Sequence, residues 1–169
     1  YLTGAGAVSR STQSITAATL DIGADSSLAI LAADDFTTVL LHSGGQATAA
    51  APLSLAGLTV TGSAPGPVPS SLTTTDSLSI TGGGAITVSD GGLVTVPGGI
   101  VGDGATTISV TGGSSRLETG GTSAIDSLSV ASGGVLENLS GTISATTLSL
   151  SGAGAFVRTA GGYDATNLN

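Results

Sequence analysis

The chain has 169 residues, of which 40% are hydrophobic but only 2% are aromatic, and its formal net charge is −8. Charged residues make up 8%, against about 25% in ordinary soluble domains, and the apolar content is too high for a disordered chain. Three arginines and no lysine against eleven acidic residues argue against binding a phosphate backbone, and no apolar run of about 20 residues is present to span a membrane.

Residues 1–50 have the least regular sequence. The Ala-rich stretch LAILAADDFTTVLL over 28–41 leads us to expect irregular turns with a short helix or cap. Leu20 in TLDIG and Leu40 in VLLHSGG are nevertheless 20 residues apart, and this spacing recurs further along the chain. The chain starts at Tyr1 rather than at a methionine and contains no cysteine. We therefore expect a processed or excised chain without disulfides.

Residues 51–169 repeat more clearly. Leu58 in GLTVTGS and Leu78 in SLSITGG have the same spacing as the two upstream leucines. Between them, the segment 63–71 (SAPGPVPSS) contains three prolines, so we expect it to bulge from the fold as an exposed loop. Ile108 follows Leu78 after one and a half times this spacing, which predicts that half a repeat is inserted around ITVSDGGLVTVPGG.

The last part of the chain contains three segments that align without gaps, 106–125, 126–145 and 146–165. Their leading apolar residues are spaced by 20 and continue into a fourth segment. These residues are Ile108, Leu128, Leu148 and Leu168.

Each repeat contains two short stretches of alternating apolar and polar residues, and each stretch is followed by glycines that suit a corner. In this alternation Leu128 points inward and Ser129 outward. A single repeat of this length cannot bury its apolar side, whereas repeats stacked about 4.8 Å apart form a continuous core. The sequence therefore predicts an all-β parallel β-helix of about eight rungs. We favour a right-handed coil, because the hexapeptide pattern of left-handed coils does not fit the observed spacing.

Catalytic residues are few. His42 is the only histidine and could join Asp34 or Asp35 and a serine in a triad, but no nucleophile elbow is present. Asp34 and Asp35 point in opposite directions in an extended chain, so they do not form a carboxylate pair. We predict that His42 is a loop or rung residue and that the chain has no catalytic site.

Calcium is the more reasonable candidate for a bound metal ion. Asp90-Gly91-Gly92 and Gly102-Asp103-Gly104 are acidic turns, and Asp21 and Asp25 are close in sequence. Calcium requires six to eight oxygen ligands, and the tandem nonapeptide that binds it in toxin repeats is missing. We interpret these residues as turn aspartates and predict no metal-binding or cofactor-binding residue.

Three polar residues take equivalent places in the gapless alignment, namely Glu118, Asn138 and Arg158. Stacking would place them in a polar ladder on the solvent-exposed side, which would contribute little stability. Asn138-Leu139-Ser140 is also a glycosylation sequon, a motif that is common by chance.

The Leu-Ser-Val-x-x-Gly-Gly pattern, the abundance of Gly, Ser and Thr and the lack of cysteine resemble passenger domains of bacterial autotransporters and related β-solenoid adhesins. The resemblance covers roughly residues 50–169 and assigns no functional residue. It implies export to the bacterial surface and roles in adhesion, aggregation or biofilm formation.

From these observations we expect a non-enzymatic, extracellular structural or adhesive module of a bacterial surface protein, whose chain continues beyond Asn169. Its expected partners are a host or neighbouring cell surface or a second copy, with glycans as further candidates and neither nucleic acid nor membrane insertion. The alternatives are a subunit of a self-assembling fibre, a phage fibre or a surface layer. A polysaccharide-active β-helix enzyme is a distant third.

Overall fold

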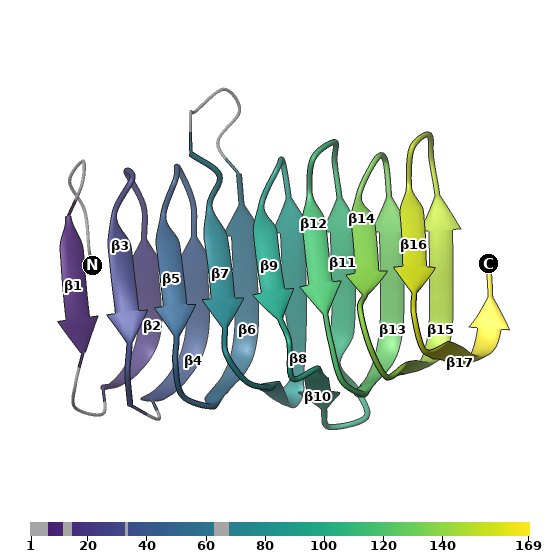
Figure 1. The fold of residues 1–169 in the computed structure, drawn as a ribbon, viewed down its shortest axis with the longest axis horizontal. Coiled ribbons are helices and arrows are strands. Elements are labelled where there is room, and N and C mark those ends of the chain that lie inside the picture. The colour runs from purple at the N-terminus through teal and green to yellow at the C-terminus, as the bar shows by residue number, and fades with distance from the viewer. Residues whose placement is uncertain (1–6, 12–14, 33, 63–67) are drawn as a thin grey trace.

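The computed structural model describes residues 7–11, 15–32, 34–62 and 68–169. These residues form seventeen strands and no helix, and the strands make two parallel sheets along an elongated coil (Figure 1). The predicted all-β parallel β-helix is confirmed.

The first sheet, here the narrow sheet, has eight strands of four residues each. In order along the coil they are β1 (Val8–Ser11), β3 (Ser27–Ile30), β5 (Gln46–Ala49), β7 (Ser71–Thr74), β9 (Leu93–Val96), β12 (Arg116–Thr119), β14 (Val135–Asn138) and β16 (Phe156–Thr159).

The second sheet, here the wide sheet, has nine strands, most of them longer. They are β2 (Thr16–Ile22), β4 (Asp34–Leu41), β6 (Leu53–Thr61), β8 (Leu78–Ser89), β10 (Ile100–Gly102), β11 (Thr107–Thr111), β13 (Ser123–Ala131), β15 (Thr142–Ser151) and β17 (Gly162–Leu168). β10 and β11 share one rung, because both pair with β8 on one side and β13 on the other.

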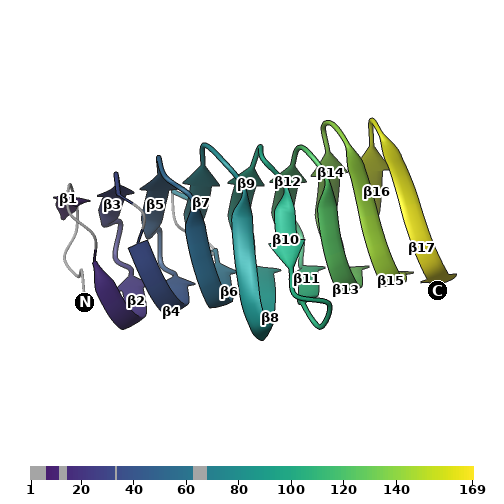
Figure 2. The same ribbon diagram turned by 90° about the horizontal axis from the view of Figure 1, so that it is seen from below.

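Each rung consists of one narrow-sheet strand followed by its wide-sheet strand. In Figure 1 the chain runs down the near, narrow sheet, crosses below, and returns upward in the far, wide sheet while the coil advances from left to right. Figure 2, seen from below, shows the same order of the two sheets. The coil is therefore right-handed, as expected for parallel strands joined by crossovers.

Strands of the wide sheet bend near their middle, which divides each into a first and a second leg (Figure 2). In β13 the bend lies at Asp126 and Ser127, two successive residues that are partly exposed between the buried Ile125 and Leu128. Each rung therefore has three sides, which are the narrow strand and the two legs. Apolar residues from all three sides fill the interior.

Inward-facing residues form continuous columns along the coil. Ile108 pairs with Leu128 and Leu128 with Leu148 in the parallel ladder. Their side chains are only 3%, 0% and 6% exposed. The predicted inward stack is confirmed.

Upstream, the predicted alignment was wrong at two leucines. Val39 occupies the inner column beside Leu20, while Leu40 is the next residue and faces outward. Leu78 pairs with Leu53 on the first leg and not with Leu58, which lies on the second leg. Both legs carry inward apolar residues. An alignment of the leucines therefore placed residues of the first leg together with residues of the second leg.

The long spacing from Leu78 to Ile108 has the same origin, and the half repeat predicted there is absent. Ile108 pairs with Ile86 on the second leg of β8. The real irregularity lies within β8, where residues 81–84 stand opposite the single residue Ala56. These extra residues widen the bend on this rung and on the next one, where residues 103–106 stand opposite residues 81–84.

Two further predictions concern local segments. The short helix expected over 28–41 is not formed, because residues 28–30 belong to β3 and residues 34–41 form β4 of the same two sheets. Residues 63–67 of the proline-rich segment lie outside the described residues. At its end Ser70 is buried and Ser71 begins β7, so the prediction of an exposed loop was wrong for these two positions.

A small-residue column marks the corner that leads into the narrow sheet. Serine and glycine alternate there on six successive rungs, as Ser26, Gly45, Ser70, Gly92, Ser115 and Gly134. The serine hydroxyls accept hydrogen bonds from turn amides of the preceding rung, from Gly44 N–H to Ser70 at 3.1 Å and from Gly91 N–H to Ser115 at 3.0 Å. The carbonyl oxygen of Val60, on an earlier rung, lies so close to Gly92 that a Cβ at this position would be only 2.4 Å from it.

Candidate functional site

The second legs of the wide sheet carry an outward surface of small polar residues, here the hydroxyl face. From β6 to β15 its three outward columns contain only Ser, Thr, Ala and Gly. Its hydroxyl residues are Thr59, Thr61, Thr87, Ser89, Thr107, Ser109, Thr111, Ser127, Ser129, Thr147, Ser149 and Ser151. Rung spacing and strand rise give the face dimensions of roughly 20 Å by 15 Å.

Hydroxyls of this face are available to a partner. Within the described part of the chain, the one side-chain hydrogen bond on the face joins Ser89 Oγ to Thr61 Oγ1 at 3.4 Å. By contrast, hydroxyls at the corners, such as those of Ser70 and Ser115, are bonded to backbone groups. The face therefore presents unused donors and acceptors in a regular array on a net-acidic molecule.

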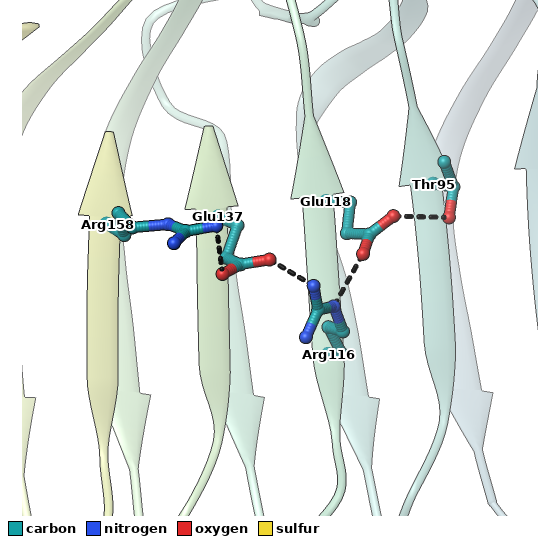
Figure 3. A network of polar contacts seen from close by, with 5 residues as sticks. All are labelled: Thr95, Arg116, Glu118, Glu137 and Arg158. Carbon is teal, nitrogen blue, oxygen red and sulfur yellow. Dashed lines mark hydrogen bonds and ion pairs between the residues drawn. The ribbon is translucent and has the colours of Figure 1, made fainter. Parts of the chain in front are cut away.

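The outer side of the narrow sheet carries a charged network across three rungs (Figure 3). Arg116 Nε lies 2.6 Å from Glu118 Oε1 on the same strand, and its Nη2 contacts Glu137 Oε2 on the next rung. Arg158 Nη2 lies 2.9 Å from Glu137 Oε1 from the other side. Thr95 Oγ1 donates to Glu118 Oε2 at 3.5 Å, which extends the network to β9.

Glu137 is the centre of this network. Its side chain is 8% exposed, whereas those of Arg116 and Arg158 are 41% and 62% exposed. The pKa of the Arg116 guanidinium is raised, chiefly by its hydrogen bond to Glu118 and also by the negative charges of Glu118 and Glu137. Two acids and two arginines balance one another, so the network joins rungs without adding net charge.

The predicted ladder of Glu118, Asn138 and Arg158 was wrong in its middle member. Glu118 pairs with Glu137, and Glu137 pairs with Arg158. The spacing from Glu118 to Glu137 is one residue shorter than the 20-residue repeat, and the spacing from Glu137 to Arg158 is one residue longer. A gapless alignment is therefore displaced by one residue on this side of the coil.

Asn138 faces inward and is 2% exposed. Its Oδ1 accepts from Thr119 Oγ1 at 3.1 Å, and its Nδ2 donates to Gly141 O at 3.1 Å and Thr159 Oγ1 at 3.3 Å. A buried amide needs such partners. The side chain of this sequon is accordingly enclosed in the folded chain.

His42 pairs with Asp21, one rung earlier, and the side chains of Asp34 and Asp35 lie outside the described part of the structure. His42 Nε2 lies 2.9 Å from Asp21 Oδ1, and Nδ1 lies 3.2 Å from Ser43 Oγ. These distances resemble a triad, but the adjacent amides are already used, since Gly44 N–H donates to Ser70 and Gly45 N–H to His42 O. They are therefore not available to stabilise an oxyanion.

The acidic turn at Asp103 is held by hydrogen bonds from its own surroundings. Asp103 Oδ2 accepts from Gly83 N–H at 2.7 Å, and this bond, with weaker ones from Ala105 and Thr106, lowers the pKa of its carboxyl. Asp90 adopts a left-handed turn conformation with φ of 51°. No group of three or more His, Cys, Asp or Glu side chains that could hold a metal ion occurs among the described residues.

Shallow depressions on the described part of the surface include three of 130–370 Å³. One of 370 Å³ lies at the bend of the first four rungs and is lined by residues of β2, β4, β6 and β8. The other two, of 130 and 280 Å³, lie where the narrow sheet ends, on either side of the exposed Leu139. Their lining includes Glu118 in one and Arg158 in the other.

Sequence reasoning missed the pairing of Glu137 with both arginines, the contact between Asp21 and His42, and the depression at the bend. The first two could be found only with the true rung lengths, which bring Glu118 to Glu137 and Leu20 to Val39.

No helix among the described residues is long and apolar enough to cross a membrane. No protein-family model matches the chain, and searches of curated proteins and of solved structures found no similar protein.

Proposed function

We propose that the chain is a non-enzymatic structural or adhesive module of a bacterial surface protein, which acts outside the cell through the sides of its coil. The hydroxyl face carries this proposal. It spans five rungs without a charged residue, its hydroxyls are largely unused, and the hydrogen-bonded ladder beneath holds them in fixed positions.

A rigid array of this kind suits contact with an extended partner better than chemistry on a small one. Catalysis by general acid–base or nucleophilic groups needs several such groups to converge on one point. Among the described residues, no three His, Cys, Asp or Glu side chains gather closely enough to hold a metal ion, and Glu118 and Glu137 are balanced by arginines. Hydroxyls both donate and accept, so they pair with neutral glycans and equally with another hydroxyl surface.

Self-assembly into a fibre or layer is the second candidate. Two copies of this chain repel each other through their net charge of −8 each, and the hydroxyl face is a surface without charged residues on which two copies can meet. Two such faces are self-complementary because every hydroxyl can donate to or accept from another.

Display of the chain on a non-adhesive bacterium tests the proposal. We expect displayed protein to increase attachment to cells or to sister bacteria. The paired change Ser109→Asp and Ser129→Asp, on adjacent rungs of the hydroxyl face, should remove this gain. The matched pair Thr48→Asp and Thr73→Asp, on adjacent rungs of the narrow sheet, should leave it unchanged. Attachment that is equal with and without displayed protein would contradict the proposal.

A further inference from the structure

The depression at the bend of the first four rungs is separate from the hydroxyl face and has its own chemistry. Its volume of 370 Å³ falls at the lower end of the range of small-molecule sites, about 300–1,000 Å³. It crosses successive rungs, so its long direction follows the coil axis. The hydroxyls around it belong to Thr16, Thr37, Ser54 and Thr81.

Most of these hydroxyls are unused. Thr81 Oγ1 donates to Leu55 O at 3.4 Å, and the hydroxyls of Thr16, Thr37 and Ser54 have no partner within the described residues. Apart from these hydroxyl residues, the described lining consists of Ala17, Ala18, Ala56 and the buried Phe36. The lining therefore combines hydroxyls with apolar residues.

One end of the depression is closed by the widened bend of β8. Residues 81–84 stand where the neighbouring rung has Ala56 alone, and Thr81, Gly82 and Gly83 are exposed. Gly82 and Gly83 both have φ of 66°, and Gly83 N–H is held by Asp103 at 2.7 Å. The wall is thus fixed by a hydrogen bond from the next rung.

Charge and backbone pairing restrict what can bind here. No charged residue is among those that line the depression in the described part of the chain, and the chain as a whole has a net charge of −8. An anionic ligand is therefore disfavoured. The backbone of β4 is paired on both sides, with β2 and β6, so a peptide would find no strand edge to extend.

We propose that this depression binds a short stretch of neutral saccharide that lies along the coil axis. Sugar hydroxyls would exchange hydrogen bonds with Thr37, Ser54 and Thr16, and the C–H face of a sugar ring would lie against the small apolar residues of the lining. The inference rests on the proposed adhesive function, since it names one class of surface ligand and the place that holds it.

Titration by NMR with neutral trisaccharides of glucose, galactose, mannose and N-acetylglucosamine tests the site, with a trisaccharide of galacturonic acid as the charged comparison. We expect at least one neutral sugar to shift amide signals at the bends of β2, β4, β6 and β8. The double change Thr37→Val and Ser54→Ala should weaken its binding about tenfold. The equivalent changes at the bend of β15, Ser144→Ala four rungs from Ser54 and Thr146→Val five rungs from Thr37, should have no effect.

The site is refuted if no neutral sugar shifts these signals, if the galacturonic acid trisaccharide binds more tightly, or if Thr37→Val with Ser54→Ala leaves binding unchanged. Bacterial attachment separates this failure from that of the proposed function. If sugar binding is absent but displayed protein still attaches, the saccharide site is wrong and the adhesive function stands. If neither occurs, both are wrong.

Discussion

Replacement of Glu137 by glutamine tests the charged network of the narrow sheet. The change removes the negative charge and keeps the shape of a side chain that is 8% exposed. In the folded chain this carboxylate contacts Arg116 on β12 and Arg158 on β16, so the change weakens the contacts between three rungs at once.

The expected cost follows from the exposure of the partners. Hydrogen bonds to charged groups contribute about 1.5–3 kcal/mol each when they are shielded from water. Here the arginine side chains are 41% and 62% exposed, and Arg116 keeps its contact with Glu118, so solvent screening reduces both contributions. We expect Glu137→Gln to lower the free energy of unfolding by about 1–3 kcal/mol.

Urea unfolding followed by circular dichroism at low ionic strength measures this loss. Glu118→Gln is the matched comparison, because Glu118 is 24% exposed and its removal leaves Arg116 bound to Glu137. It should cost less than about 1 kcal/mol. The reasoning is wrong if Glu137→Gln unfolds like the unchanged protein, or if Glu118→Gln is the more damaging of the two.

Two further changes test packing in other parts of the coil. Burial raises the pKa of Tyr163 to about 12 from 10, and its buried hydroxyl has no partner among the described residues. The unfolded chain therefore loses this proton first, and stability should fall as the pH rises from 10 to 12; Tyr163→Phe should reduce that fall in urea midpoints without loss of stability at neutral pH. Gly92→Ala would bring a methyl group to 2.4 Å from Val60 O and should cost about 1–3 kcal/mol, whereas Gly113→Ala, with open space around it, should be tolerated. Equal urea midpoints for the two alanine variants would contradict the close approach at Gly92.

The sequence alone was sufficient for the fold and for the inner column of the last rungs. In the last rungs, consecutive residues of the inner column are always 20 positions apart, as Ile108, Leu128 and Leu148 are. Repetition there is a direct consequence of stacking, since each rung must present the same small cross-section to its neighbours.

Alignment failed where the rungs change length or where two apolar residues are adjacent. Val39 and Leu40 are equally apolar, and only the length of the rung, one residue short of the repeat, decides that Val39 points inward. Glu137 was missed for the same reason, because a shorter rung followed by a longer one restores the average spacing and hides the displacement. Corner lengths are set by turn geometry and are not visible in the strand pattern.

The candidate sites depend on the outer side, where sequence carries less information. Serine and threonine columns were predictable from the alternation around Ser129, but which hydroxyls stay unused depends on the contacts at each corner. The depression at the bend arises from the extra residues 81–84 next to small alanines. The hydroxyls of this depression come from four rungs whose lengths differ, so no sequence motif indicates the site.

Amide hydrogen exchange on Leu128→Asp and Ser129→Asp tests the assignment of inner columns and outer faces most directly. Leu128 is fully buried, so aspartate there adds a buried, unpaired charge to the lost packing, which alone costs about 2–5 kcal/mol. We expect it to remove protection from β13, β15 and β17 while the rungs around Leu20 and Val39 stay protected, and Ser129→Asp to leave protection almost unchanged. Loss of protection from Ser129→Asp with tolerance of Leu128→Asp would show that the two sides are inverted. Loss everywhere at once from Leu128→Asp would show that the rungs are not coupled only to their neighbours.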